Sequence, residues 1–272
     1  MILKGKVVFV TGASRGIGRA IALEAAQQGA KVVLAARSVE PHPQLAGTLG
    51  SVAADVTAAG GEALVCPMDV RSEDEIDRAV AKAVDTFGGI DALVNNAGAL
   101  STRGTERTSA ARFDLLYQTN VRGAFLATRA CLSHLRKSKN PHVLMIAPKP
   151  LLKSKWLAPH LPYTVSKYGM SLLVIGMAEE FREPGIAVNA LWPRTYIATA
   201  AMNLVGGEAA ARRARRPEIV AEAACAILRR SSRTCSGNFY LDEEVLREEG
   251  VTDFSGYSVE PGAEPLPDLF VE

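Results

Sequence analysis

The chain has 272 residues, of which 48% are hydrophobic and 22% charged, and its formal net charge is +2. This length and hydrophobic content allow a sizeable core and exclude a disordered protein. The nearly balanced charge argues against a general nucleic-acid binder, and the apolar runs are too short to cross a membrane.

The cysteines and histidines give no sign of a metal site or a disulfide framework. The four cysteines lie far apart with no C-x-x-C pair, and the four histidines show no H-E-x-x-H spacing, so buried reduced thiols are expected. The apolar first strand leaves no room for a signal peptide, and the last residues are not a peroxisomal S-K-L address. We therefore predict a cytoplasmic protein with no metal, no membrane span and no nucleic-acid partner.

A glycine-rich turn near the N-terminus is the segment around which the sequence is organised. Thr11–Gly18 reads TGASRGIG, follows the apolar run Val7–Val10 and opens a segment, Ile17–Ala26, with helical apolar spacing. Such a turn binds a pyrophosphate, because backbone N–H groups and the helix dipole point at it and glycines let it approach. The spacing is G-x3-G-x-G rather than the commoner G-x-G-x-x-G, and a glycine turn without a ligand is the alternative interpretation.

The second predicted strand, Lys31–Ala36, ends at Arg37 and Ser38. In a dinucleotide-binding fold this strand end meets the adenosine ribose, where an acidic residue binds a free 2′-hydroxyl. An arginine instead holds a 2′-phosphate through charge-assisted hydrogen bonds, and Arg15 of the glycine turn can approach the same phosphate. We therefore predict NADP rather than NAD, with solvated surface arginines as the alternative.

Strands and helices then alternate with short connections. The next predicted elements are a loop at 40–44, a helix to about Ala59, a strand at 62–68, a helix from a capping box of Ser72 and Glu75 to about Phe87, and a strand at 90–94. Asp69, after the third strand, is expected to accept a hydrogen bond from the adenine amino group, or to be an ordinary turn aspartate. The alternation predicts an α/β fold with a single doubly wound parallel sheet and helices on both faces.

A long helix from Arg112 to about Lys137 is predicted next, and it contains Asn120. Asparagine has poor propensity for a helix interior and usually lies on the outside. Because the helix has a broad apolar flank, a water-exposed and functional Asn120 is an option.

The helix that opens at Tyr163 and runs to about Arg182 carries the next candidate site. It follows a fifth strand at 143–147 and a proline-punctuated loop at 148–162. Lys167 lies one turn after Tyr163, and side chains at i and i+4 share one helical face. Taken alone, this pair is a weak signal.

Four motifs, in this order and at these intervals, resemble the classical short-chain dehydrogenases/reductases. They are Thr11-Gly12-x3-Gly16-x-Gly18, Asn95-Asn96-Ala97-Gly98, Asn120 and Tyr163-x3-Lys167. The resemblance covers residues 4 to about 242 and implies a Rossmann-type fold and NAD(P)-dependent oxidoreductase activity. Further stretches resemble one group of that family in which a lipid-carrier domain often follows the dehydrogenase; they lie at 35–43, 168–171, 176–181, 189–193 and 237–239. This sequence stops before such a domain.

The resemblance also implies roles for single residues. Tyr163 would be the acid or base; a free phenol titrates near pH 10, and Lys167 with the oxidised nicotinamide would lower that pKa. Lys167 would also hold the nicotinamide ribose, Asn120 a water of the proton relay, and Asn95 and Gly98 would line the cofactor. The residues expected to bind the cofactor are Gly12, Ser14, Arg15, Gly16, Ile17, Gly18, Arg37, Asp69, Val70, Asn96, Ala97, Gly98, Tyr163, Lys167, Pro193, Thr195 and Ile197.

The sequence departs from the family pattern after the fifth strand. The family has a serine there that hydrogen-bonds the substrate oxygen, whereas this chain has Ala147 and Pro148. Losing such a donor costs roughly 10²–10³-fold in rate. Ser154, Lys149 or a water is expected to replace it, unless the substrate needs less polarisation or the activity is low.

The region after Pro193 is expected to shape the substrate entrance. The family usually has glycine where this chain has Arg194, which we expect to narrow the entrance or meet an anionic substrate group, with a surface arginine as the alternative. Residues from about 195 to 216 would form a mobile lid, with Thr199 capping its helix near the pyrophosphate. A solvated face, or contact with an acyl-CoA phosphate, is expected for four arginines of the lid, Arg212, Arg213, Arg215 and Arg216.

The C-terminal segment differs from the rest in composition. A last strand at 239–241 closes a predicted dinucleotide-binding and catalytic domain of residues 1–242, and residues 243–272 form an acidic extension. From Asp242 to Glu272 there are ten acidic residues against one basic residue. The extension is expected to cover the basic lid, reach a neighbouring subunit or extend into solvent.

These features predict an NADP-dependent oxidoreductase that interconverts a carbonyl and a secondary alcohol on a hydrophobic or lipid-like small molecule, as in lipid metabolism. The lipid-like expectation rests on the resemblance and on four residues of the loop before Tyr163, which are Leu151, Leu152, Trp156 and Leu157. The resemblance implies a homodimer or homotetramer through the helices bearing Asn120 and Tyr163. The alternatives are a cofactor-binding protein with weak or no catalysis, since the serine is absent, and an enoyl-thioester reductase.

Overall fold

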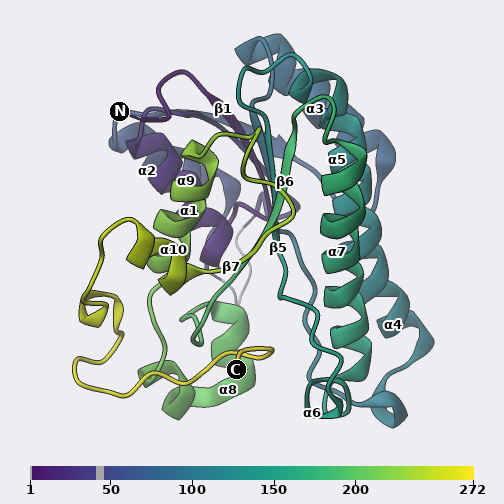
Figure 1. Ribbon diagram of the computed structural model, residues 1–272, viewed down its shortest axis with the longest axis vertical. Coiled ribbons are helices and arrows are strands. Elements are labelled where there is room, and N and C mark those ends of the chain that lie inside the picture. The colour runs from purple at the N-terminus through teal and green to yellow at the C-terminus, as the bar shows by residue number, and fades with distance from the viewer. Residues whose placement is uncertain (1, 41–45) are drawn as a thin grey trace.

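A computed structural model describes residues 2–40 and 46–272, apart from the side chains of residues 201 and 203–205. Seven parallel strands form one sheet in the order β3-β2-β1-β4-β5-β6-β7 (Figure 1). They are β1 (Val7–Thr11), β2 (Lys31–Ala36), β3 (Glu62–Pro67), β4 (Ala92–Asn95), β5 (His142–Ile146), β6 (Ala187–Trp192) and β7 (Phe239–Leu241). The strand order reverses between β1 and β4, which confirms the predicted doubly wound fold.

Helices cover both faces of the sheet (Figure 1). One face carries α1 (Gly16–Gln27), α2 (Leu49–Ala58), α9 (Glu218–Arg229) and α10 (Asp242–Glu248), and the other carries α3 (Glu73–Phe87), α5 (Gly123–Leu135) and α7 (Leu161–Glu180). Alternate side chains of each central strand enter the two resulting apolar cores. Successive strand residues point to opposite faces, so a strand buried on both faces is almost entirely apolar, as β1 is before Thr11 and β2 is after Lys31.

Among the described residues, the four cysteines are unpaired and buried. Burial raises the pKa of the Cys66 thiol, and it raises that of Cys131 to about 12, so both remain uncharged thiols. Within residues 2–40 and 46–272, no helix has the length and hydropathy required to cross a bilayer.

The predicted helix from Arg112 to Lys137 is two helices rather than one. Helix α4 (Ala110–Tyr117) passes through a π-helical turn, Gln118–Arg122, into α5. The predicted start of the preceding helix is correct, since the Ser72 hydroxyl accepts from the Glu75 N–H at 3.4 Å. The capping box also predicts that the Glu75 carboxylate accepts from the Ser72 N–H. It accepts instead from the Asp69 N–H, at 2.7 Å.

Three elements had no counterpart in the sequence analysis: β6, α9 and α10. The loop at 148–162 also contains a short helix, α6 (Ser154–Leu157). Most of the predicted loop at 40–44, including His42, lies outside the described residues. Most of helix α10 lies in the predicted acidic extension. The many charged residues there gave no indication that Val245 and Leu246 are buried.

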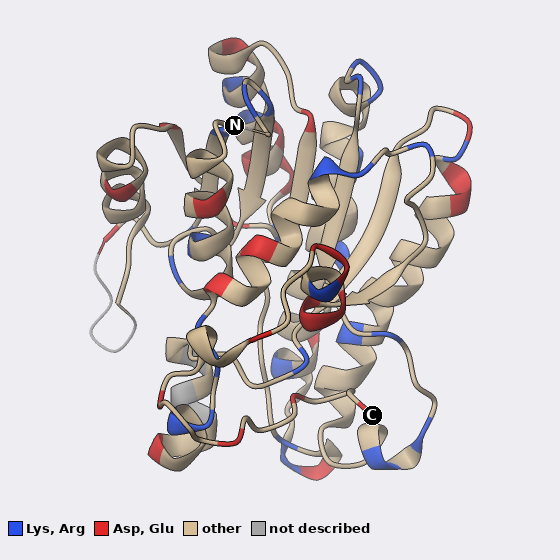
Figure 2. Ribbon diagram, turned by 60° about the vertical axis from the view of Figure 1, so that its left-hand side comes forward, with Lys and Arg blue, Asp and Glu red and all other residues tan. Residues whose placement is uncertain are grey.

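Residues 242–272 pack on their own chain. Val245, Leu246, Phe254 and Phe270 are buried in the same core as α1 and α9. The acidic side chains of this segment pair with arginines of its own chain, as in Arg229–Glu249 at 2.6 Å and Arg230–Glu248 at 2.7 Å. Figure 2 shows acidic and basic segments interleaved here rather than gathered on separate faces. The C-terminal segment is therefore built into the fold.

Candidate active site

Two adjoining cavities open at the carboxyl ends of the strands. The first, of about 370 Å³, is lined by Gly12, Ser14, Arg15, Gly16, Ile17, Ala36, Arg37, Ser38, Met68, Asp69, Val70, Asn96, Ala97, Gly98, Thr119, Thr199 and Ala200. The second, of about 440 Å³, is lined by Ile17, Asn96, Gly98, Ala99, Leu100, Thr102, Ile146, His160, Tyr163, Lys167, Trp192, Pro193, Tyr196, Ile197, Thr199, Met202, Asp268 and Leu269. Ile17, Asn96, Gly98 and Thr199 belong to both, so a ligand can extend from one cavity into the other.

The glycine turn forms the floor of the first cavity. Gly12 and Gly16 have φ values of 68° and 54°, a backbone conformation that favours glycine. The Asn96 side chain donates from Nδ2 to the carbonyls of Thr11 and Gly12, at 3.0 and 3.2 Å. A Cβ on Gly18 would lie 2.3 Å from that nitrogen and 2.4 Å from the Gly12 carbonyl oxygen. The turn therefore requires glycine at position 18 to keep its shape.

Two arginines lie at the far end of the first cavity. Arg15 donates from Nη2 to the Gly47 carbonyl at 2.8 Å, and its buried Nε has no partner among the described residues. Burial and the charge of Arg37 lower the pKa of Arg15. The Arg37 side chain is 68% exposed and lies 3.9 Å from the Asp69 carboxylate. Two cations thus face one space, where an anion would relieve their repulsion.

Asp69 lies beside them, at the end of β3. Arg71 holds its carboxylate at 2.6 Å and keeps its pKa below the usual range. Asp69 is therefore a carboxylate acceptor at the cavity wall. The buried Arg15 nitrogen without a partner among the described residues and the glycine turn, which a Cβ at position 18 would obstruct, fit a dinucleotide in this cavity.

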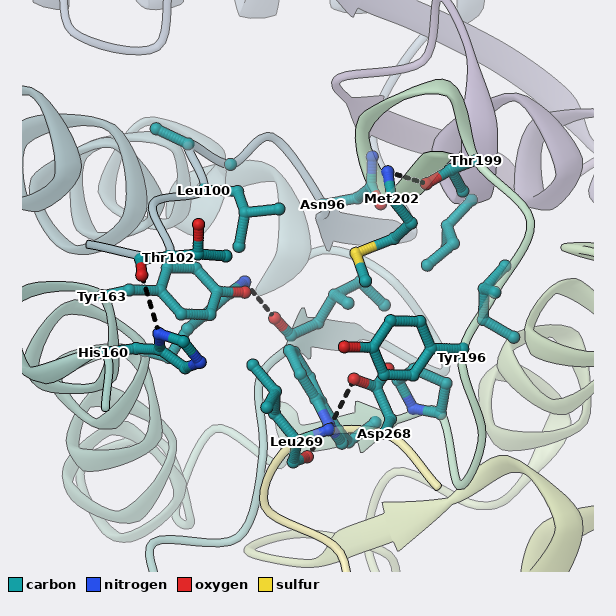
Figure 3. Close-up of a pocket in the computed structure, with 18 residues that line it drawn as sticks. Asn96, Leu100, Thr102, His160, Tyr163, Tyr196, Thr199, Met202, Asp268 and Leu269 are labelled. Atoms are coloured by element: carbon teal, nitrogen blue, oxygen red, sulfur yellow. Dashed lines mark hydrogen bonds between the residues drawn. The ribbon is translucent and has the colours of Figure 1, made fainter. Parts of the chain in front are cut away.

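Tyr163 and Lys167 lie one turn apart on α7 and both line the second cavity (Figure 3). Lys167 donates from Nζ to the Ile146 carbonyl at 2.8 Å, and this nitrogen lies 5.3 Å from the centroid of the Trp192 ring. Burial lowers the pKa of Lys167 to about 8. Burial and the Asp268 carboxyl raise the pKa of Tyr163. In the protein without a cofactor the pKa of Tyr163 is thus raised, and the expected lowering, which includes the charge of the oxidised nicotinamide, stays a prediction.

Asn120 is not water-exposed, and that expectation is wrong. The side chain is fully buried in the π-helical turn. Its amide accepts from the Ala99 N–H at 2.7 Å and donates to the Ala99 carbonyl at 3.0 Å and the Ser166 hydroxyl at 2.9 Å. Asn120 therefore joins the loop after β4 to α7 and positions the helix that carries Tyr163.

The other predicted cofactor residues divide into two groups. Those lining a cavity are Gly12, Ser14, Arg15, Gly16, Ile17, Arg37, Asp69, Val70, Asn96, Ala97, Gly98, Pro193 and Ile197. Gly18, Thr195 and Asn95 line neither. Thr195 is buried and pairs with Pro267 in an antiparallel bridge, whereas Asn95 donates to Thr128 at 3.1 Å behind the sheet edge.

Neither of the two side chains expected to replace the family serine, Lys149 and Ser154, lines the second cavity. Ala147 packs in the core on the α3, α5 and α7 face, and the Pro148 carbonyl accepts from Ser171 at 2.7 Å. Lys149 and Ser154 are both exposed. The cavity wall beside Tyr163 is completed by other residues.

The C-terminal segment supplies part of that wall, which the sequence analysis missed. Asp268 and Leu269 line the second cavity (Figure 3). The Asp268 N–H donates to the Arg194 carbonyl at 3.0 Å, and the Trp192 indole donates to the Leu269 carbonyl at 2.8 Å. The Phe270 ring lies 5.4 to 6.4 Å from four aromatic rings, those of Trp156, Tyr163, Tyr168 and Trp192.

The end of the chain is held by charge as well. The Glu272 carboxylate pairs with Lys153 at 2.7 Å and Lys155 at 2.9 Å, and these ammonium groups lower its pKa to about 2. Nothing local in the sequence marked Asp268 as a site residue, because it lies about one hundred positions after Tyr163 in an acidic segment with three prolines.

The segment predicted to form a lid contains a helix. Helix α8 (Ala200–Arg212) begins at Thr199, whose hydroxyl accepts from the Met202 N–H at 3.3 Å, which confirms the predicted cap. A positive φ at Gly207 marks a kink within it. Tyr196 and His160, which the sequence analysis did not single out, also line the second cavity.

Two expectations about arginines are wrong. Arg194 lines neither cavity, because its guanidinium pairs with Glu244 at 2.8 Å. Arg215 is buried and pairs with Glu243, so the four lid arginines do not form one solvated face. Acidic residues of the C-terminal segment neutralise both side chains.

Comparisons with known proteins agree on one family. A model of the short chain dehydrogenase family matches residues 6–207. Hydroxysteroid dehydrogenase-like protein 2 from Danio rerio is 52% identical over 99% of this chain and 65% of its own length. The crystal structure of a Xanthomonas campestris protein is 53% identical, with a TM-score of 0.97 and full coverage of both chains. A short chain dehydrogenase from Mycobacterium thermoresistibile is 47% identical, with a TM-score of 0.94 over 99% of this chain and 96% of that one.

These matches confirm the resemblance found in the sequence. The chain spans less than two-thirds of the length of the curated relatives it matches. Two more distant structures hold cofactors. One, from Mycobacterium paratuberculosis, is bound to NAD (22% identity, TM-score 0.76, 89% and 97% coverage), and a metagenomic oxidoreductase is in complex with NADP (29%, 0.72, 89% and 98%). The fold thus accommodates either nicotinamide cofactor.

Replacing Gly18 with alanine tests whether the glycine turn binds the dinucleotide. The new Cβ would meet the Asn96 amide and the Gly12 carbonyl, and overpacking of this kind costs about 1–3 kcal/mol. We expect NADPH affinity, measured by fluorescence titration, to fall at least about tenfold.

Gly176→Ala is the matched control, because nothing lies within 4 Å of a Cβ there. It removes a helical glycine of α7 and should stabilise the fold slightly without changing NADPH affinity. Equal affinities in the two variants would contradict the assignment of the turn.

Proposed function

Because the chain belongs to the short-chain dehydrogenase family, a family of oxidoreductases that bind nicotinamide cofactors, we propose that it interconverts a carbonyl and a secondary alcohol with NADP, with Tyr163 as the acid and base. The observation that carries the proposal is the position of Tyr163 and Lys167 in the second cavity, which shares Asn96 and Gly98 with the first. A nicotinamide that extends across this boundary would lie against the phenol.

The preference for NADP is supported by the two arginines at the end of β2. Arg15 offers a buried Nε without a partner among the described residues, and Arg37 lines the same cavity. The nearest carboxylate, Asp69, is already held by Arg71. The 2′-phosphate of NADP would meet two guanidinium groups, whereas the 2′-hydroxyl of NAD would meet no carboxylate at the end of β2.

The side chains of the second cavity divide the chemistry among them. When bound, the nicotinamide supplies or accepts the hydride. In the direction of reduction, Tyr163 gives its proton to the substrate oxygen, and in oxidation it takes that proton back. The Lys167 ammonium, fixed on the Ile146 carbonyl, favours the charged phenolate and holds the nicotinamide ribose. Asn120 keeps α7 in place through Ser166.

A hydrophobic or lipid-like substrate is supported by the lining of the second cavity. Leu100, Ile146, Trp192, Met202 and Leu269 contribute apolar surface, and pockets of this kind favour apolar ligands with few polar contacts. The four loop residues on which the sequence-based expectation rested do not line the cavity; they are Leu151, Leu152, Trp156 and Leu157.

The absent serine favours a second candidate function. Two alternatives depend less on a hydrogen-bond donor to the carbonyl oxygen. One is a protein that binds the cofactor and catalyses weakly, and the other is an enzyme that reduces an enoyl thioester instead of a carbonyl. These alternatives predict slow turnover of ketones, and the enoyl reductase also predicts turnover of a 2-enoyl-CoA.

A homodimer or homotetramer is supported by an apolar surface on α4, α5 and α7. Among the described residues, large hydrophobic side chains remain exposed there, namely Phe113, Tyr117, Phe125, Val165, Leu172 and Ile175. Exposed apolar surface of this kind marks sites of protein association.

Replacing Tyr163 with phenylalanine removes the proposed proton donor and keeps the ring that packs against Phe270. We expect turnover of a panel of medium-chain ketones with NADPH to fall by about 10²–10⁴-fold. NADPH affinity should change little, since the hydroxyl acts on the substrate. The measurement is NADPH absorbance for turnover and fluorescence titration for affinity.

Tyr117→Phe, at an exposed position of α4, is the control and should keep full activity. Wild-type protein that binds NADPH but turns over no ketone would favour the cofactor-binding alternative. Turnover of a 2-enoyl-CoA alone would favour the reductase of double bonds.

Replacing Arg37 with alanine tests the cofactor preference. Losing a charge-assisted hydrogen bond to a phosphate costs about 1.5–3 kcal/mol, so NADPH affinity should fall roughly 10–100-fold. NADH affinity should change less than about threefold, because NADH lacks the 2′-phosphate. Arg136→Ala, an exposed arginine after α5, is the control. An equal loss for both cofactors would contradict the role in 2′-phosphate binding.

A further inference from the structure

The second cavity contains a polar group that the proposed reaction leaves unused. Asp268 reaches this cavity from the C-terminal segment, while the position of the family serine is occupied by Ala147 and Pro148. In Figure 3 the Asp268 carboxyl lies with the Tyr196 hydroxyl on one side of the cavity, and the Tyr163 hydroxyl points in from the other. Among the described residues, a carboxyl and no serine thus lines this cavity.

The backbone around Asp268 is held on three sides. Its N–H donates to the Arg194 carbonyl at 3.0 Å, and the preceding Pro267 pairs with Thr195. The following two residues are fixed by the Trp192 indole, which donates to the Leu269 carbonyl, and by the ring cluster around Phe270. Such support preorganises a side chain for binding.

One carboxyl oxygen is occupied and the other is not. Oδ1 of Asp268 accepts from the Leu269 N–H at 2.6 Å. No hydrogen bond to Oδ2 is found among the described residues. This second oxygen is the one free to interact with a ligand in the cavity.

The surroundings of Asp268 favour its neutral form. Withdrawal from bulk water raises its pKa to about 8, and the Asp242 carboxylate acts in the same direction. The Leu269 N–H and the Lys167 ammonium act against the rise. Tyr163 and Tyr196 also face this carboxyl and are themselves kept neutral, because burial raises their pKa values and an ionised Asp268 would raise them further. A neutral carboxyl has an O–H to donate.

We propose that Asp268 is a further catalytic residue, whose carboxyl donates a hydrogen bond to the substrate carbonyl oxygen in place of the missing serine; this rests on the proposed carbonyl reduction. Asp268 keeps its own proton throughout. Tyr163 gives the proton that becomes the alcohol hydrogen, and the hydrogen bond from Asp268 stabilises negative charge as it develops on the oxygen.

Of the other polar groups of the cavity, His160 suits this role less well. The His160 ring is engaged with the Thr102 carbonyl at 3.1 Å. Tyr196 lies on the same wall as Asp268, at the start of the segment that leads to α8. Asp268 has a backbone that is held by hydrogen bonds and a carboxyl oxygen, Oδ2, for which no partner is found among the described residues.

Three variants separate donation from charge and from structure. Asp268→Ala removes the donor, and Asp268→Asn keeps a donor that cannot ionise. Glu264→Gln is the control, because it removes a 90% exposed carboxylate from the same segment. Each variant is assayed as the full chain with NADPH and the ketone that wild type reduces fastest, and thermal unfolding and NADPH affinity are recorded for all.

Asp268→Ala should lower kcat by about 10²-fold with little change in KM, whereas Asp268→Asn should stay within about tenfold of wild type. Because a raised pKa of about 8 keeps the carboxyl protonated below that pH, wild-type kcat should fall as the pH rises through 8. That fall should be smaller in Asp268→Asn, where only Lys167 and Tyr163 still titrate. Glu264→Gln should match wild type.

An infrared readout tests the protonated carboxyl without turnover. Between the pKa of Asp242, about 6, and that of Asp268, about 8, the C=O band of a protonated carboxyl should be present in the ligand-free wild-type protein and missing from Asp268→Asn, and in wild type it should disappear above pH 8. Absence of a band that depends on Asp268 would overturn the inference.

The kinetic results also distinguish this inference from the proposed function. If wild type reduces ketones, Tyr163→Phe abolishes that activity and Asp268→Ala does not, the inference on Asp268 alone is wrong. It is also wrong if Asp268→Asn is as slow as Asp268→Ala with an unchanged pH profile, which would indicate a structural role. If wild type reduces no ketone, or Tyr163→Phe is fully active, the proposed function itself fails.

Discussion

The packing of the Phe270 ring is the interaction on which the substrate side of this molecule depends. Four aromatic rings from α6, α7 and β6 surround it at 5.4 to 6.4 Å. Phe270 has a φ of 68°, which is uncommon for a residue other than glycine. Such strain costs about 1–3 kcal/mol, and aromatic pairs contribute about 0.5–1.5 kcal/mol each beyond burial. The rings therefore offset the strain and fix the C-terminal segment against Tyr163.

This arrangement divides the active site into two parts of different origin. The cofactor side is formed by the turns after β1, β2 and β4, which the strand order brings together. The substrate side is completed by residues 266–270, which follow the last strand by more than twenty positions. Acidic residues of the same segment pair with Arg194 and Arg215, so these arginines support the segment rather than a ligand.

The features that the sequence predicts have local signals. The glycine turn, the pair of Tyr163 and Lys167 on one helical face and the Thr199 cap all depend on spacing within a few residues. The second part depends on contacts between distant positions. Nothing near Asp268 reveals that its backbone meets Arg194, and the charge of the extension conceals the buried side chains of α10. Asn120 was misjudged as exposed because a π-helical turn rotates it into the interior.

The central claim is that the C-terminal segment is a fixed wall of the active site, and hydrogen exchange on the full chain tests it most directly. The amides of Tyr196, Leu266 and Asp268 each donate to a backbone carbonyl across this junction. Exchange at these three amides should be at least about 10²-fold slower than in an unfolded chain, and they should open together. Exchange at unfolded-chain rates, with the sheet still protected, would contradict the claim.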